Sequence, residues 1–174
     1  MASGADRLRS RRTGRRLALS ALFEAEFGQR TASAILERHL AETEGDAEAG
    51  DLARTLVEAV VRNREEIDTR IGALAPQYPV VQLARMDRAL LRGAVGEVLH
   101  SPTPARVAIA EWVELARIYS GEPMRRLMNG VLGRVAPASS GPARQPSPSS
   151  EEGVSGQHVR PTEETRRRTA RRRR

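Results

Sequence analysis

The sequence predicts an all-α protein, and three observations lead to that fold class. Between residues 11 and 136, apolar side chains recur at the three- and four-residue spacing of amphipathic helices. No segment shows a convincing alternation of apolar and polar residues, which would indicate a half-buried strand. Aromatic residues make up only 3% of the chain, so the core must come from Leu, Val, Ile and Ala. We expect about seven helices in two groups.

Four helices are expected in the first half of the chain. The first, RRLALSALFEAEF, has one apolar face, formed by Leu19, Leu22, Phe23 and Phe27. A short second helix, TASAILERHLAE, begins at Thr31, and a third lies within GDAEAGDLARTLVEAVV. Asn63 is placed to cap a fourth, REEIDTRIGALA, whose first-turn acids suit the positive end of the helix dipole.

Three more helices are expected in the second half. PQYPVVQLARM contains two prolines and breaks the pattern, which predicts a boundary between the halves at Pro76–Leu83. A fifth helix begins near Met86 and ends at HSPTP. Thr103 and Pro104 supply a cap and the favoured first-position proline for the sixth, PARVAIAEWVELARIYS. The last helix has a full apolar stripe: Met124, Leu127, Met128, Val131, Leu132 and Val135.

Positive charge gathers at the two ends of the chain. All 29 basic residues are Arg, and the formal net charge is +7. Residues 1–16 and 137–174 each have a net charge of +5, whereas residues 17–136 have −3. We therefore expect a flexible basic arm over 1–10, a helical domain over 11–136 and an Arg-rich tail over 137–174. The tail should be disordered, because its Pro, Ser and Gly content offers no apolar face to bury.

Composition and motifs argue against several function classes. The chain has no cysteine, which excludes disulfides, thiolate metal sites and cysteine nucleophiles. No apolar run approaches the roughly 20 residues that cross a bilayer, and none completes a signal peptide, so we expect a cytoplasmic protein with no membrane partner. The three histidines are scattered, and Glu111 and Glu114 resemble acids on any solvated helix. We expect no enzymatic activity, no cofactor and no metal site.

The strongest chemical signal is the cluster of six arginines between Arg7 and Arg16. Positive charge at a helix N-terminus opposes the helix dipole, so the cluster indicates an external anionic partner. Arginine binds phosphate bidentately and stacks on bases, and arginine-rich segments often become ordered on RNA. These properties favour single-stranded RNA, although charge alone does not separate RNA from DNA. A merely solubilising arm is the alternative.

Three blocks of the sequence resemble, in order, the transcription antitermination factor NusB family. They are RRLALSALFEAEF, MDRALLRGAVGEVL and TPARVAIAEWVELARIYSGEPMRRLMNGVLGRV, within about Arg11–Ala136. The resemblance implies two three-helix bundles plus an N-terminal helix, with no catalysis and no cofactor. It also implies binding to the boxA element of ribosomal RNA leaders together with the small-subunit ribosomal protein NusE. That complex would join RNA polymerase and other Nus factors to suppress termination.

The resemblance also assigns RNA-binding residues. The arginine-rich segment of the family falls on Arg11, Arg12, Arg15 and Arg16. A second RNA patch precedes the NGVL motif and consists of Arg125, Arg126 and Leu127. The family often has an aromatic residue where Leu127 stands, and leucine cannot stack on a base in that way. Leu127 is therefore either an RNA contact or a core residue. Asn129 and Gly130 are expected to be structural.

Phe23 and Asp87 match positions that face the ribosomal protein partner in relatives. Core packing remains open for Phe23, and a helix-terminal acid for Asp87. Tyr78 is the nearest substitute for the tryptophan usually found between the halves. The alternative function is an all-α homodimeric protein-interaction module that binds RNA nonspecifically through its basic arms. A fragment of an RNA methyltransferase with the same fold would require a glycine-rich cofactor domain.

Overall fold

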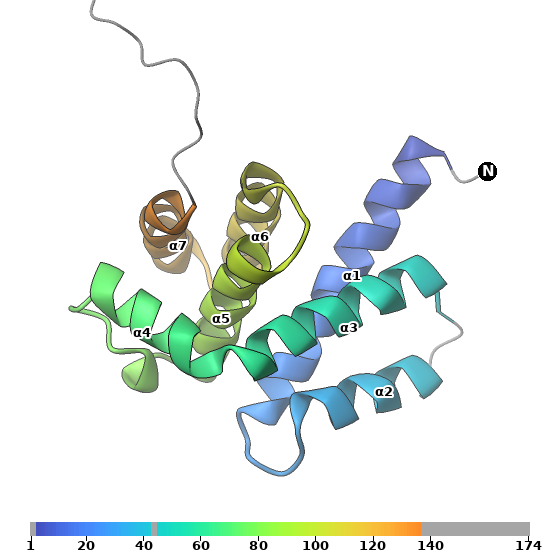
Figure 1. Ribbon diagram of the computed structural model, residues 1–174, viewed down its shortest axis with the longest axis horizontal. Coiled ribbons are helices and arrows are strands. Elements are labelled where there is room, and N and C mark those ends of the chain that lie inside the picture. The colour runs from blue at the N-terminus through green and yellow to red at the C-terminus, as the bar shows by residue number, and fades with distance from the viewer. Residues whose placement is uncertain (1–2, 43–44, 137–174) are drawn as a thin grey trace, which may run out of the picture. The chain divides into compact units, whose positions relative to one another are not determined.

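The computed structural model describes residues 3–42 and 45–136, and all regular structure in these ranges is helical (Figure 1). The elements are α1 (Gly4–Ala25), α2 (Ala32–Glu42), α3 (Ala47–Arg62), α4 (Arg64–Leu74), the 3-10 helix η1 (Val80–Gln82), α5 (Arg85–His100), α6 (Ala105–Tyr119) and α7 (Glu122–Val135). The predicted all-α class is confirmed. The tail expected over 137–174 lies outside the described residues.

Helix α1 begins closer to the N-terminus than expected. Ser3 and Asp6 form a capping box in which the Ser3 hydroxyl accepts the Asp6 N–H at 3.2 Å. The Asp6 carboxylate in turn accepts the Ser3 N–H at 3.1 Å. The cap satisfies two N–H groups and places a negative charge at the positive end of the dipole. Residues 4–10 are therefore helical, which corrects the expectation of a flexible arm over 1–10.

Helices α1, α2 and α3 pack against one another as the first group, with α1 alongside α3 (Figure 1). The close approach of α1 to α3 depends on Gly14, because a Cβ atom there would lie 2.7 Å from the Ala49 carbonyl oxygen. Ala18 and Ala21 continue this face of α1 and are fully buried. Small side chains thus set the spacing of the first group.

Helix α5 is the central element of the second group and packs against α4, α6 and α7. Ten consecutive residues, Ala89 to Val98, are buried, which is the pattern of a helix covered on all sides. Gly93 admits the ring of Trp112 from α6, and Gly96 admits Val60 from α3. The contact at Gly96 joins the two groups into one core.

The junction between α3 and α4 differs from the sequence-based expectation. Asn63 makes no side-chain cap for α4, and its amide Nδ2 donates instead to the Ala59 carbonyl at 2.8 Å, closing the end of α3. Because α4 packs against α5 and α7, the two groups divide at Asn63 and not at Pro76–Leu83. The segment between α4 and α5 is a turn that includes η1.

Residues 3–42 and 45–136 contain neither a candidate membrane span nor a candidate metal site. No helix in these ranges is long and apolar enough to span a membrane. No group of three or more His, Asp or Glu side chains in the same ranges could hold a metal ion.

Candidate nucleic-acid interface

The exposed edge of α1 carries Arg9, Arg12 and Arg16. Residues three and four apart lie on the same side of a helix, so the three guanidinium groups form one basic edge. Arg16 is exposed, and none of the ion pairs within residues 3–42 and 45–136 includes it. The early start of α1 adds Arg9 to this edge, which the sequence prediction had confined to Arg11 and later residues.

Arg12 already binds a carboxylate. Its Nε and Nη2 donate to Glu111 of α6 at 3.2–3.3 Å. The Arg12 side chain is 57% exposed, which makes this pair weak and its exchange for another anion easy. The same Nε–Nη2 edge of arginine forms bidentate hydrogen bonds to phosphate. Arg12 is therefore exposed, but its guanidinium is already paired with Glu111.

Arg15 occupies a different environment from its neighbours. Its side chain is 1% exposed, and its Nη2 and Nε donate to the buried Glu97 carboxylate at 2.6 and 3.0 Å. Trp112 Nε1 donates to the same carboxylate at 2.6 Å. A guanidinium enclosed in this way cannot reach a phosphate without leaving the core. Direct RNA contact by Arg15 stays a prediction, whereas in this structure its side chain fixes α1 against α5 and α6.

Arg11 lies on the side of α1 that faces the start of α3. Its Nε is 3.9 Å from Glu48, and the two side chains are 47% and 42% exposed. Ser10, one residue earlier, donates to the Asp46 carboxylate, which also caps α3. Arg11 is accessible, but it points to a different neighbour from Arg12 and Arg16.

The second predicted patch is organised by Glu122, the first residue of α7. Arg125 Nε and Nη2 donate to its carboxylate at 2.7 and 2.6 Å, and Arg126 Nε donates at 3.3 Å. The hydrogen bonds from Arg125, supported by Arg126, lower the pKa of Glu122 to about 2. The Arg126 side chain is 75% exposed. The carboxylate thus orients both arginines and offsets part of their charge.

The outer face of α6 connects the two basic patches. Glu111, Glu114 and Arg117 follow one another at three-residue intervals and lie on one side of the helix. Arg117 Nε and Nη2 donate to Glu114 at 3.0 and 2.5 Å. Arg117 lowers the pKa of Glu114 chiefly by this hydrogen bonding, with a small contribution from the charge of Arg12. Arg12, α6 and Glu122 are therefore parts of one continuous charged row.

A groove of about 730 Å³ lies beside the second patch, between the α4–α5 turn and α7. Arg126, Leu127 and Arg134 line one side of it, and Tyr78 and Asp87 line another. Leu127 is half-buried: it packs on the core and also lines the groove. Tyr78 is 46% exposed and places an aromatic ring in the groove where Leu127 offers none.

Asp87 lies close to the start of α7, whereas Asn129 and Gly130 lie on the exposed side of that helix. Asp87 accepts a hydrogen bond from the Ser120 hydroxyl at the α6–α7 junction and lies in the first turn of α5. Asn129 and Gly130 are both exposed, and a Cβ atom on Gly130 would meet nothing within 4 Å. Gly130 was expected to be structural, but it does not lie at a close contact between helices.

Phe23 belongs to an aromatic cluster at the end of α1. Its ring packs edge-to-face with Phe27 at 5.4 Å between centroids. Arg85 Cζ lies 4.6 Å from the centroid of the Phe27 ring, which joins this cluster to the start of α5. Phe23 is half-buried against the core, whereas Phe27 is 52% and nearby Val81 75% exposed. Phe27, and not Phe23, is therefore the exposed aromatic residue of this cluster.

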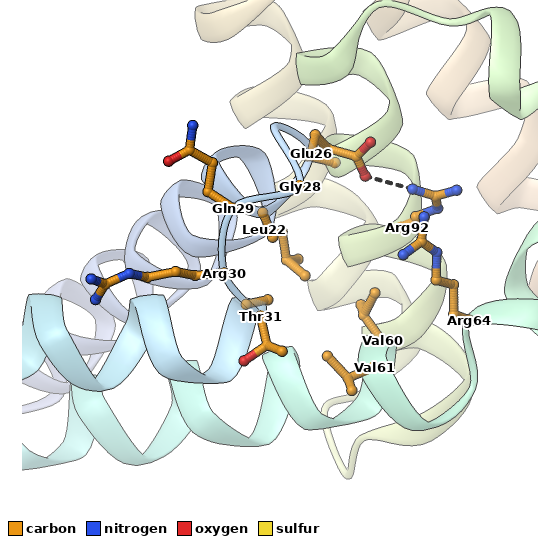
Figure 2. Close-up of a pocket in the computed structure, with 13 residues that line it drawn as sticks. Leu22, Glu26, Gly28, Gln29, Arg30, Thr31, Val60, Val61, Arg64 and Arg92 are labelled. Atoms are coloured by element: carbon orange, nitrogen blue, oxygen red, sulfur yellow. Dashed lines mark hydrogen bonds and ion pairs between the residues drawn. The ribbon is translucent and has the colours of Figure 1, made fainter.

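A pocket of about 450 Å³ opens at the α1–α2 turn (Figure 2). Leu22 and Val60 point into it, and Arg64 points toward Arg92. Arg92 is 4% exposed and donates to Glu26 at 2.5 Å and to Asp68 at 2.7 and 2.8 Å. This buried ion network ties α1, α4 and α5 together beneath the pocket.

Comparison with known proteins gives consistent matches over the helical part of the chain. The sequence profile of the NusB family matches residues 12–137. A transcription antitermination protein NusB from Dehalococcoides mccartyi is 37% identical over 137 residues, covering 78% of this chain and 96% of that protein. The corresponding protein from Symbiobacterium thermophilum is 40% identical over 143 residues, covering 77% and 94%.

Solved structures agree with the sequence matches. NusB from T. maritima superposes with a TM-score of 0.66 and 33% identity, covering 72% of this chain and 89% of that one. A structure of the antitermination factors NusB and NusE in complex with double-stranded RNA gives a TM-score of 0.62 and 26% identity. It covers 73% of this chain and 96% of the matched chain.

Proposed function

Because this chain belongs to the NusB family, we propose that it is a transcription antitermination factor that binds boxA-type single-stranded RNA together with the ribosomal protein NusE. In this role it joins RNA polymerase and other Nus factors in the cytoplasm to sustain ribosomal RNA transcription. The relatives are named for antitermination and not for a reaction, and we propose no catalytic role.

One observation carries the RNA-binding part of this proposal. The basic edge of α1 stands on a helix whose rotation is fixed by the buried Arg15–Glu97 pair. Arg12 and Arg16 consequently face solvent from a rigid support, one turn apart. Guanidinium groups held in a defined geometry bind successive phosphates with little loss of conformational entropy. Such an edge is better suited to a defined RNA path than a flexible arm would be.

The groove beside α7 supplies the second half of the proposed RNA site. Single-stranded bases are recognised by stacking on aromatic rings and by contact with flanking cations. Tyr78 offers the ring, Arg126 and Arg134 offer the charge, and Leu127 offers an apolar floor. We propose that a base of the RNA stacks on Tyr78, which substitutes for an aromatic residue at position 127.

The proposed NusE surface is the aromatic cluster at the end of α1. Phe27 and Val81 are large apolar side chains that stay exposed, and Arg85 lies over the Phe27 ring. The pocket at the α1–α2 turn adjoins this cluster, because Gln29 and Arg30 line both that pocket and the one beside Phe27. Phenylalanine and arginine are both enriched in protein–protein interfaces, which supports this surface as the NusE contact.

The proposed function is tested by fluorescence anisotropy with a boxA-like RNA and with a scrambled RNA of equal length. Each is titrated at two salt concentrations, with and without NusE. We expect tighter binding of the boxA-like RNA, and we expect NusE to increase that preference. Phe27→Ala should remove the effect of NusE while leaving binding to RNA alone unchanged. Equal, salt-sensitive binding of both RNAs that NusE does not alter would contradict the proposal.

A further inference from the structure

Three carboxylates along α6 and α7, two of them exposed and that of Glu111 half-buried, each accept hydrogen bonds from the forked edge of an arginine. The pairs are Glu111 with Arg12, Glu114 with Arg117, and Glu122 with Arg125. In each pair, Nε and Nη2 of one guanidinium donate to one carboxylate. The same edge binds the two oxygens of a phosphate, so these donors cannot serve a carboxylate and an RNA backbone at once.

We propose that Glu111, Glu114 and Glu122 are intramolecular competitors of RNA phosphates, and that Arg117 is a further RNA contact reached by exchange. The proposal rests on the proposed RNA-binding function and adds to it. Glu114, the partner of Arg117, interacts with the charge of Arg12, and Arg117 interacts with the charge of Glu122 at the start of α7. An RNA strand that joins the basic edge of α1 to the groove beside α7 would therefore pass close to Arg117.

Two of the three pairs have no evident task in the fold. Glu114–Arg117 and Glu122–Arg125 each join residues three apart within one helix. By contrast, Arg54–Glu37 joins α3 to α2 and Arg38–Glu24 joins α2 to α1. An intrahelical pair whose side chains are 53% and 55% exposed, as in Glu114–Arg117, contributes little to stability. Its effect on the charge of the surface is larger than its effect on folding.

As a consequence, the positive charge of Arg12, Arg117 and Arg125 is largely neutralised by these carboxylates as long as no RNA is bound. Each carboxylate lowers the local positive potential and so weakens attraction to polyanions in general. Exposed ion pairs exchange readily, and an RNA that is fixed by its base contacts can displace several of them together. The carboxylates therefore limit binding to the large excess of nonspecific RNA without altering the base contacts.

The test compares Glu114→Gln with the wild-type protein. Gln keeps the shape of the side chain and removes its charge. We expect the dissociation constants for the boxA-like and scrambled RNAs to fall by the same factor, about two- to fivefold, as expected for loss of one exposed competing pair. The matched control is Glu58→Gln on α3, which breaks the exposed intrahelical pair with Arg62 and changes the net charge equally. Its dissociation constants should stay close to the wild-type values.

A second variant separates competition from a change of overall charge. In the Glu114→Gln background, Arg117→Ala should cancel the gain in affinity, because the released guanidinium is then absent. Circular dichroism and urea unfolding of every variant check that the fold is unchanged. The proposal of competition would be overturned if Glu114→Gln increased the affinity for RNA no more than Glu58→Gln does, or if it weakened binding.

The outcomes also distinguish this inference from the proposed function. If the protein prefers the boxA-like RNA and Glu114→Gln leaves the dissociation constants unchanged, the inference alone is overturned. Equal binding of both RNAs, tightened by Glu114→Gln, would overturn the proposed function alone. Absence of RNA binding by the wild-type protein would overturn both.

Discussion

Arg15 and Glu97 form an ion pair inside the protein, with Arg15 Nη2 2.6 Å from Glu97 Oε1 and side chains 1% and 0% exposed. Trp112 donates to the same carboxylate, so α1, α5 and α6 meet at Glu97. A buried charge must be paired, and this requirement fixes the rotation of α1. The pair therefore decides which arginines of the cluster face solvent.

Arg15→Ala should strongly destabilise the fold. The substitution leaves the Glu97 carboxylate buried without its cationic partner, for which we expect a loss of about 3–5 kcal/mol in the free energy of unfolding. Urea unfolding followed by circular dichroism measures this loss. Arg16→Ala, one residue along on the exposed edge, is the control and should change stability by no more than about 0.5 kcal/mol. Equal stability of the two variants would contradict the structural role of Arg15.

Arg16→Ala should instead weaken RNA binding. If Arg16 neutralises one phosphate, its removal should reduce the slope of log binding constant against log salt by about 0.7 for single-stranded RNA. The measurement is a set of anisotropy titrations at several salt concentrations. Arg62→Ala, on α3, removes the same charge from a position outside the proposed site and should leave the slope unchanged. A slope that Arg16→Ala does not alter would remove Arg16 from the interface.

Gly93→Ala should destabilise the second helix group. An added Cβ would lie 2.4 Å from Cη2 of Trp112, whose ring is fully buried and cannot move freely. Overpacking of this kind costs about 1–3 kcal/mol, which thermal or urea unfolding detects. The matched control is Gly133→Ala in α7, where an added Cβ meets nothing within 4 Å. That variant should gain about 0.5–1 kcal/mol from helix propensity, and a similar effect at Gly93 would contradict the packing described.

The Glu122 carboxylate should titrate well below an ordinary glutamate. Its pKa is lowered from 4.5 to about 2, first by the hydrogen bonds from Arg125. Because the folded-state pKa is depressed, the pair favours the folded state fully above about pH 4.5 and loses this effect as the pH falls toward 2. Side-chain carboxyl NMR measures the titration directly. Arg125→Gln should move the pKa of Glu122 back toward 4.5, and an unchanged pKa would show that Arg125 does not hold the carboxylate.

The helices were largely predictable because their apolar spacing is regular. Met124, Met128, Val131, Leu132 and Val135 are all buried, as the stripe in α7 predicted. The start of α1 was missed because Leu8 is 45% exposed and the first turns have no apolar face to signal a helix. The Ser3–Asp6 capping box could have predicted the start of α1, but the arginine-rich segment after it was interpreted as a flexible arm.

The candidate site was less predictable than the fold, because residue type does not give the direction of a side chain. Arg12, Arg15 and Arg16 are the same residue type in one short segment, yet their environments differ. Arg15 is buried and paired with Glu97, Arg12 is exposed and paired with Glu111, and Arg16 is exposed. A buried Arg needs a buried acid, and Glu97 is separated from Arg15 by 82 positions. Spacing alone had suggested that Glu111 and Glu114 were ordinary solvated acids. The partner of Glu111, Arg12, becomes apparent only when α1 and α6 are packed together.

The central claim is that one RNA strand contacts both the basic edge of α1 and the groove beside α7. Photo-crosslinking with a boxA-like RNA that carries 4-thiouridine at successive positions tests this claim directly. The account predicts crosslinks to the α1 peptide containing Arg12 and Arg16 and to peptides containing Tyr78 or Leu127, all reduced by unlabelled boxA-like RNA but far less by the scrambled RNA. Crosslinks confined to residues 137–174, or reduced equally by both competitors, would contradict it.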